Sequence, residues 1–146
     1  MASSPKSILI TTSFQKRLKK LKRQFSEDDV VANITDFIHR GLRKGEAILA
    51  TESFGAVTIV IVKCRIRKHQ AVGRYLLGVI HEQEYLPIFL DLKTGVYGKN
   101  LSFQANSRVV SMLNTALVEV LTDYLEHTDA TPRLTRYTID EPERDA

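Results

Sequence analysis

The chain has only one cysteine and no long apolar run among its 146 residues. Because Cys64 is alone, the chain can form neither an intrachain disulfide nor a cysteine-based zinc site. No stretch approaches the roughly 18 apolar residues of a membrane-spanning helix. The N-terminal residues also lack the apolar core of a signal peptide. We therefore expect a protein of the reducing cytoplasm that has no membrane partner.

Several catalytic motifs are missing as well. The sequence contains no P-loop glycine pattern, no Ser-His-Asp context and no histidine pair at metal-ligand spacing. These absences speak against nucleotide kinases, triad hydrolases and zinc enzymes, so we expect neither a metal nor a cofactor. The histidines are scattered, and a lone histidine is more often a surface or capping residue than a catalyst. His69 is the most interesting one because it follows a basic segment.

The composition that remains is that of a globular domain with a basic bias. Hydrophobic residues make up 43% of the chain and charged residues 26%, which is ordinary for one soluble domain of this length. The 21 Lys and Arg residues outnumber the 17 Asp and Glu residues, which gives a net charge of +4. This excess favours a polyanionic partner without identifying it.

The segment from Val57 to Lys68 (VTIVIVKCRIRK) reads as a long strand whose two faces differ. Strand side chains alternate between faces, so one face stays apolar while the other changes from aliphatic to cationic, with Lys63, Arg65 and Arg67 in a row. Such a row is typical of an anion-binding surface. An edge strand that is protected from aggregation by its charges would look the same, so both interpretations stay open here.

Two helices are expected before this strand. Phe14, Leu18, Leu21 and Phe25 recur at helical spacing, and the residues between them are strongly basic. This first helix would therefore bind an acidic partner or simply present a solvated face; its basic residues are Lys16, Arg17, Lys19, Lys20, Lys22 and Arg23. Ser26 and Asp29 resemble a capping box at the start of a second helix that extends to Lys44, before Gly45.

The other segments follow from the same kinds of pattern. Pro87 cannot donate a hydrogen bond in a ladder, so its strand is expected to lie at an edge or to begin there. The expected elements are a strand at 7–12, a connector at 46–56, antiparallel strands at 74–81 and 85–93, a glycine-containing loop at 94–100 and a long helix that starts at Asn106 or Ser107. Residues 1–127 would form one domain, and residues 128–146, with two prolines and little periodicity, a flexible exposed tail.

In this order of elements the chain resembles the RelE/ParE superfamily of toxins from type II toxin–antitoxin modules, and within it the RelE/HigB-like branch. The resemblance covers about Ile8 to Tyr124 and is carried by FQKRLKKLKRQF, KCRIR, VGRYLLGVI and FLDLKTGVYGKNLS. It implies an α+β fold in which an N-terminal strand and a helical hairpin pack on an antiparallel sheet, with a long C-terminal helix. It also implies a cytoplasmic toxin whose partners are a cognate antitoxin, RNA and the ribosome.

The resemblance implies a metal-independent endoribonuclease that cleaves mRNA, free or on the ribosome, and so inhibits translation. Such cleavage needs a base for the 2′-hydroxyl, cations for the charge that develops on phosphorus, and an acid for the leaving oxygen. The candidate catalytic residues are Lys63, Arg65, Arg67, Arg74 and Lys93. Neighbouring cations favour the neutral form of a lysine, so Lys63 or Lys93 is the expected base, and Arg65 or Arg67 would clamp the phosphate.

Further residues are expected to bind the substrate rather than to react with it. They are Lys68, His69, Tyr97 and Lys99 near the sheet, and Lys16, Lys19, Lys20, Lys22 and Arg23 on the first helix. Tyr97 could stack on a base or orient the phosphate, although a tyrosine in a loop is more often simply packed.

One local order differs from the family pattern. Family members commonly carry Gly-Tyr-Arg or Gly-aromatic-Arg at the start of the strand after the turn, whereas here the order is Gly73, Arg74, Tyr75. Because adjacent strand residues face opposite ways, the exchange could turn Arg74 away from the basic row. Two other functions therefore stay open, a ParE-like gyrase inhibitor and a non-catalytic RNA- or protein-binding domain.

Overall fold

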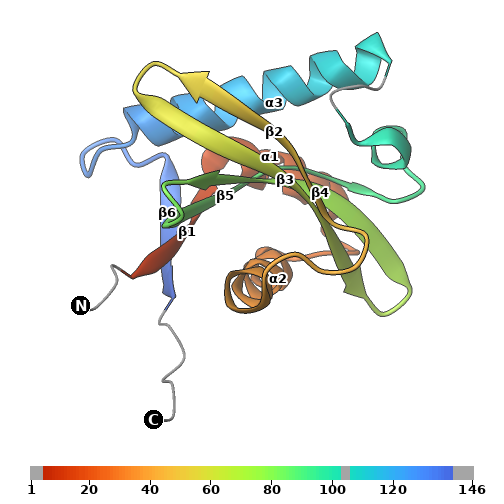
Figure 1. The fold of residues 1–146 in the computed structure, drawn as a ribbon. Helices are drawn as coiled ribbons and strands as arrows, with labels where there is room; N and C mark the ends of the chain where they lie inside the picture. The colour runs from red at the N-terminus through yellow and green to blue at the C-terminus, as the bar shows by residue number, and fades with distance from the viewer. Residues whose placement is uncertain (1–4, 103–105, 140–146) are drawn as a thin grey trace.

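The computed structural model of the chain describes residues 5–102 and 106–139 (Figure 1). Over these residues the fold is α+β, with a six-stranded mixed sheet and three α-helices. The elements are β1 (Lys6–Thr11), α1 (Thr12–Leu18), the 3₁₀ turn η1 (Lys19–Leu21), α2 (Glu27–Arg40), β2 (Ala47–Phe54), β3 (Val57–Lys68), β4 (Ala71–Ile80), β5 (Glu84–Leu92), the 3₁₀ turn η2 (Gly98–Asn100), α3 (Ser107–Glu126) and β6 (Leu134–Ile139).

The sheet has the strand order β2-β3-β4-β5-β1-β6. The strands β3 to β5 form the expected antiparallel meander, and β2 pairs antiparallel with β3. The strand β1 pairs with β5 in parallel, and β6 pairs with β1 antiparallel. Figure 1 shows α2 and α3 on opposite sides of this sheet. None of the helices in the described part of the chain is long and apolar enough to cross a membrane.

The helix starts follow the capping residues that the sequence contains. Ser26 and Asp29 form the predicted capping box, since Asp29 N–H donates to Ser26 Oγ at 3.2 Å and Ser26 N–H donates to Asp29 Oδ2 at 2.8 Å. Asn106 caps α3 through Val109 N–H. The prediction that α2 reaches Lys44 is wrong, because the helix ends at Arg40 and Gly41 adopts a φ of 77° that glycine tolerates best.

Three further expectations are wrong. The connector at 46–56 contains β2, which pairs with β3. The expected tail at 128–146 contains β6, which pairs with β1 along six residues, from Lys6 opposite Ile139 to Thr11 opposite Leu134. Pro87 lies inside the sheet, next to a register shift at Leu76 and Leu77; a bulge is one of the few interior places where a strand tolerates proline.

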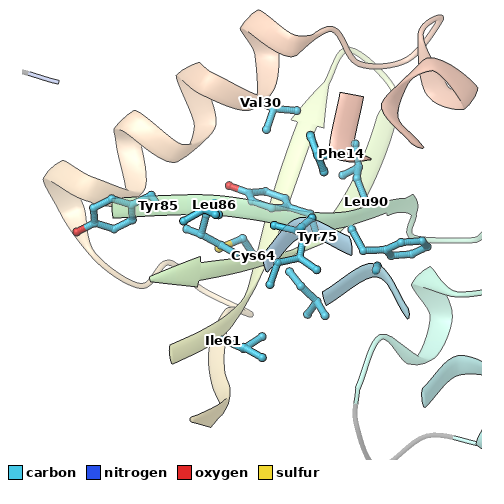
Figure 2. Packing of buried hydrophobic residues seen from close by; sticks show 14 of the residues in the cluster. Phe14, Val30, Ile61, Cys64, Tyr75, Tyr85, Leu86 and Leu90 are labelled. Carbon is cyan, nitrogen blue, oxygen red and sulfur yellow. The ribbon is translucent and has the colours of Figure 1, made fainter. Parts of the chain in front are cut away.

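The core fills the space between the sheet and its helices. Figure 2 shows Cys64 and Tyr75 on the side of Val30 from α2, whereas Ile61 lies on the other side of the strands. Alternation along β3 therefore sends even-numbered side chains toward α2 and odd-numbered ones toward the side of α3. Lys63, Arg65 and Arg67 belong to the second side.

Candidate nucleic-acid interface

The second half of β3 and the adjoining part of β4 carry a cluster of cations on the α3 side of the sheet. We call Lys63, Arg65, Arg67 and Arg74 the basic face. Arg65 lies directly opposite Arg74 in the β3–β4 ladder. Arg74 therefore shares the face of Arg65, and the exchanged order of Arg74 and Tyr75 does not turn the arginine away from the basic row.

The basic face is organised in three cross-strand rows. Arg65, Arg74 and Asp91 form the central row. On one side of it Lys63 lies opposite Leu76, and on the other side Arg67 lies opposite Val72.

Lys93 extends the row of Arg67 and Val72, because its N–H donates to the Val72 carbonyl at 2.8 Å. Rows are two residues apart, about 6.6 Å, so Lys63 and Lys93 flank the arginine pair.

The arginine pair at the centre is not explained by the stability of the sheet. The Arg65 N–H points away from β4 and donates to Glu46 Oε2 at 2.8 Å. Arg65 and Arg74 are therefore a non-hydrogen-bonded pair, in which Cα atoms lie only about 4.5 Å apart. Like charges that face each other across two strands destabilise a sheet, so this arrangement favours a bound anion.

No carboxylate within residues 5–102 and 106–139 forms an ion pair with any member of the basic face. Backbone carbonyls hold the two arginines instead. Arg65 Nη1 donates to the Lys44 carbonyl at 3.2 Å, and Arg74 Nη1 donates to the Gly98 carbonyl at 3.1 Å. The carbonyls orient the guanidinium groups without neutralising them, which leaves the charge available to a ligand.

Asp91 maintains the loop that holds Arg74. Its carboxylate accepts hydrogen bonds from the N–H groups of Leu92, Tyr97 and Gly98 at 2.8, 3.0 and 3.1 Å. The Tyr97 ring packs edge-on against Phe89, with ring centroids 5.5 Å apart. Tyr97 is thus a packed loop residue, and Asp91 is engaged by backbone donors although it belongs to the central row.

A buried polar network lies on the opposite side of β3, and the sequence reasoning missed it. The Arg43 guanidinium donates to both Glu46 oxygens, at 2.8 and 2.7 Å, and also to Asn33 and Asp36. The Glu46 side chain has no exposed surface. The Tyr75 hydroxyl donates to Asn33 Oδ1 at 2.6 Å. The only sequence signal was the short spacing of Arg43 and Glu46, and it spanned the expected end of a helix and the start of an expected connector.

This network controls the protonation of its members. Burial by itself would raise the pKa of the Glu46 carboxyl, but hydrogen bonds from Arg43 and from the Arg65 N–H outweigh it and lower that pKa. Burial, assisted by the Glu46 charge, raises the pKa of the Cys64 thiol to about 12. Glu46 is therefore an anion and Cys64 a neutral thiol near pH 7, so the cysteine offers no nucleophile.

Two of the residues expected to bind substrate lie away from the central row. Lys68 points to the α2 side, where its Nζ contacts Asp29 Oδ2 at 2.9 Å, so its charge is paired away from the basic face. His69 is the first residue of the β3–β4 turn, with a φ of 55°. It follows Arg65 by four residues, about 13 Å along a strand, which is too far for both to hold one phosphate.

Lys99 is exposed, and so are the basic residues of the first helix except Arg17, which pairs with Glu119 at 2.9 Å. The Lys99 carbonyl lies 3.4 Å from Arg74 Nη1, so this lysine borders the basic face. Lys16, Lys19 and Lys22 surround a hollow of about 460 Å³ whose floor contains Leu18 and Phe25. Lys20 and Arg23 are exposed on η1 and just after it. In the described structure no hydrogen bond or ion pair joins these helical cations to the basic face.

No group of three or more His, Cys, Asp or Glu side chains among the described residues could hold a metal ion. Comparison with known proteins found no matching protein-family model, no matching curated protein and no matching solved structure.

Proposed function

We propose that the chain has a RelE-like fold and acts as a toxin that binds RNA across the basic face and cleaves it without a metal ion. The observation that carries the proposal is the pair of Arg65 and Arg74, which lie directly opposite each other and have no described carboxylate partner. Planar guanidinium groups bind phosphate oxygens through two parallel hydrogen bonds. The negative charge of a phosphodiester between the two arginines would offset the repulsion between their guanidinium groups.

The flanking lysines supply the proton transfers that backbone cleavage needs. A base takes the proton of the ribose 2′-hydroxyl, whose oxygen attacks the adjacent phosphorus while the bond to the 5′-oxygen breaks, and an acid protonates that oxygen. Lys63 and Lys93 lie on either side of the arginine pair. In this proposal one lysine is the base, the other is the acid, and the two arginines stabilise the charge on the phosphate.

An antitoxin is the proposed protein partner. An acidic segment that folds on binding would find complementary charge on the exposed lysines of α1 and η1. Neutralisation by the product of the neighbouring gene would support this partner, and a neighbour that fails to bind would count against it.

A second candidate is a non-catalytic RNA-binding domain of the same fold. This candidate is favoured because the groups that could have assisted catalysis are engaged in other contacts or lie far from the arginine pair. Asp91 is engaged by three N–H groups, Tyr97 packs on Phe89, and His69 lies at the distant turn. Binding without cleavage would therefore need only the cations.

The first prediction separates cleavage from binding. Arg65→Ala and Arg74→Ala remove contacts that strengthen as charge develops, so each should lower RNA cleavage by about a hundredfold to a thousandfold, with a smaller loss of RNA affinity. Cleavage of end-labelled RNA in EDTA and RNA binding at equilibrium measure the two effects. Arg40→Ala is the control, since Arg40 is an exposed arginine of α2 that pairs with Asp36.

Two results would contradict the catalytic proposal. If the purified chain binds RNA and no new 5′ ends appear in the RNA of induced bacteria, the non-catalytic candidate is correct. If Lys63→Ala and Arg65→Ala weaken only binding, in proportion to the lost charge, the basic face is an electrostatic surface and not a catalytic site.

A further inference from the structure

A hollow of about 300 Å³ lies beside the basic face, at an open edge of β3. The strand β2 pairs with β3 only as far as Ala47 opposite Lys63, so within residues 5–102 and 106–139 the edge of β3 beyond Lys63 has no neighbouring strand. The α2–β2 loop crosses this edge instead. We call the space the edge hollow; it is lined by Asn33, Arg43, Lys44, Arg65, Ile66, Arg67 and Val72. Its volume is at the lower end of typical ligand pockets, roughly 300–1,000 Å³.

The charge in the edge hollow is strongly positive and only partly neutralised. Arg43 is occupied by Glu46 and Asp36, at 2.7 and 3.1 Å. Lys44, Arg65 and Arg67 form no ion pair with any carboxylate of the described residues. Three cations are thus free at one place, which is more than a phosphodiester with a single negative charge requires.

The Arg65 side chain is held in this hollow by the backbone of Gly45, which passes close to it. Gly45 has a φ of 85°, and a Cβ atom on it would lie 2.7 Å from Arg65 Nη1 and 2.9 Å from Arg65 Cδ. Arg65 Nη1 donates to the Lys44 carbonyl, and the described residues offer its guanidinium no other hydrogen bond. The side chain is therefore positioned between the loop and the strand, and its other N–H groups are left for a ligand.

We infer that the edge hollow binds a terminal phosphate of RNA, that is, a phosphate monoester at one end of the strand that crosses the basic face. A phosphate monoester carries about −1.5 to −2 charges near pH 7, so three free cations favour it over an internal phosphodiester. Arg65 can contact both this phosphate and the neighbouring phosphodiester, because a guanidinium has five N–H donors and one of them is bound to the Lys44 carbonyl. Lys44 and Arg67 add charge. The inference rests on the proposed function in that RNA reaches the edge hollow along the basic face.

Short 2′-O-methyl RNA oligonucleotides test the inference, because they cannot be cleaved through the 2′-hydroxyl. Three forms of one sequence are compared by fluorescence anisotropy, with a 5′-phosphate, with a 3′-phosphate or with hydroxyls at both ends. We expect one phosphorylated form to bind the full chain about tenfold more tightly than the hydroxyl form, as for charge-assisted hydrogen bonds. Inorganic phosphate and a nucleoside monophosphate should compete only weakly.

Two pairs of variants locate the effect. Gly45→Ala should abolish the preference for the phosphorylated form, because the new methyl group displaces Arg65. Gly41→Ala is its matched control, since Gly41 has a similar φ of 77° but a methyl group added there would have nothing within 4 Å, and it should keep the preference. Lys44→Ala should reduce the preference severalfold, whereas Arg136→Ala, on β6 at the other end of the sheet, should leave it unchanged. Circular dichroism checks that each variant is folded.

Three results would overturn the inference. The three RNA forms could bind equally, the preference could survive in both Gly45→Ala and Lys44→Ala, or inorganic phosphate or the nucleotide could bind as tightly as phosphorylated RNA. The last result would assign the edge hollow to a free anion. Failure of the proposed function is seen separately, because a chain that cleaves no RNA can still prefer a terminal phosphate.

Discussion

Arg43 and Glu46 show how one buried ion pair connects a loop to the candidate site. Glu46 has no exposed side-chain surface, and its oxygens accept hydrogen bonds from the Arg43 guanidinium and from the N–H of Arg65. Removing one partner of a buried pair leaves the other charge uncompensated. The pair therefore holds the α2–β2 loop against β3 and indirectly positions Arg65.

Glu46→Gln should destabilise the fold in a pH-dependent way. The pKa of Glu46 is lowered in the folded state, so its contribution is present above the unfolded pKa and is lost as pH falls through the folded pKa. We expect the variant to lose about 3 kcal/mol of unfolding free energy at pH 7. The difference from the parent protein should shrink as the pH is lowered below about 4.5.

Urea denaturation at pH 7, 4 and 3 measures this difference. Glu52→Gln is the control, because Glu52 is exposed on β2 and should change the unfolding free energy little at any pH. A Glu46→Gln variant as stable as its parent at pH 7 would show that the pair only orders the loop.

At the scale of elements, β6 stabilises more than its position near the chain end suggests. It covers the outer edge of β1, and the Tyr137 hydroxyl donates a hydrogen bond to Glu27 Oε2 in the first turn of α2. Gln15 Nε2 donates to the other Glu27 oxygen at 2.8 Å. Glu27 thus joins the helices α1 and α2 to β6, which is more than 100 residues away in the sequence.

Tyr137→Phe should lower the unfolding free energy by about 1 kcal/mol, since a hydrogen bond to a carboxylate is among the stronger ones and this one is only partly buried. The bond also raises the pKa of Tyr137 to about 12. A double-mutant cycle with Glu27→Gln isolates the pair. A coupling free energy near zero would show that β6 is held by its ladder with β1 alone.

The whole molecule has a sheet with two edges, and the β2 edge is the more open to association. Its sequence AILATESF contains one charged residue and no proline, and Ile48 is 60% exposed. Unpaired backbone groups on such an edge can pair with another chain. The register shift between Ile48 and Ala50 disturbs this edge only at one end.

Ile48→Lys should therefore reduce aggregation of the concentrated protein severalfold without lowering its unfolding free energy, because a lysine opposes edge-to-edge pairing. Light scattering over time and thermal denaturation measure the two properties. Leu42→Lys is the matched control, since Leu42 is also exposed, at 49%, but lies in the α2–β2 loop. Equal protection by both variants would point to general hydrophobicity and not to the strand edge.

Local patterns were sufficient for most of the elements. The alternation of Val57–Lys68 predicted β3 to the residue, and the capping residues Ser26 and Asn106 predicted the starts of α2 and α3. The meander was predicted from three strand-like segments in succession. Such signals can be read from the sequence because strand alternation and helix capping involve residues only a few positions apart.

The long-range pairings could not be read in this way. Only the β3–β4 register places Arg74 opposite Arg65, and only the tertiary structure sends Lys68 to Asp29 and Glu46 beneath Arg65. The strand β6 has weak periodicity by itself and is defined by its pairing with β1 at the far end of the sequence. By itself the sequence therefore determined which cations lie on one face of β3. The tertiary structure decided which residue of β4 meets them and that the cation of the other face, Lys68, is paired, because contacts between distant segments depend on register and packing.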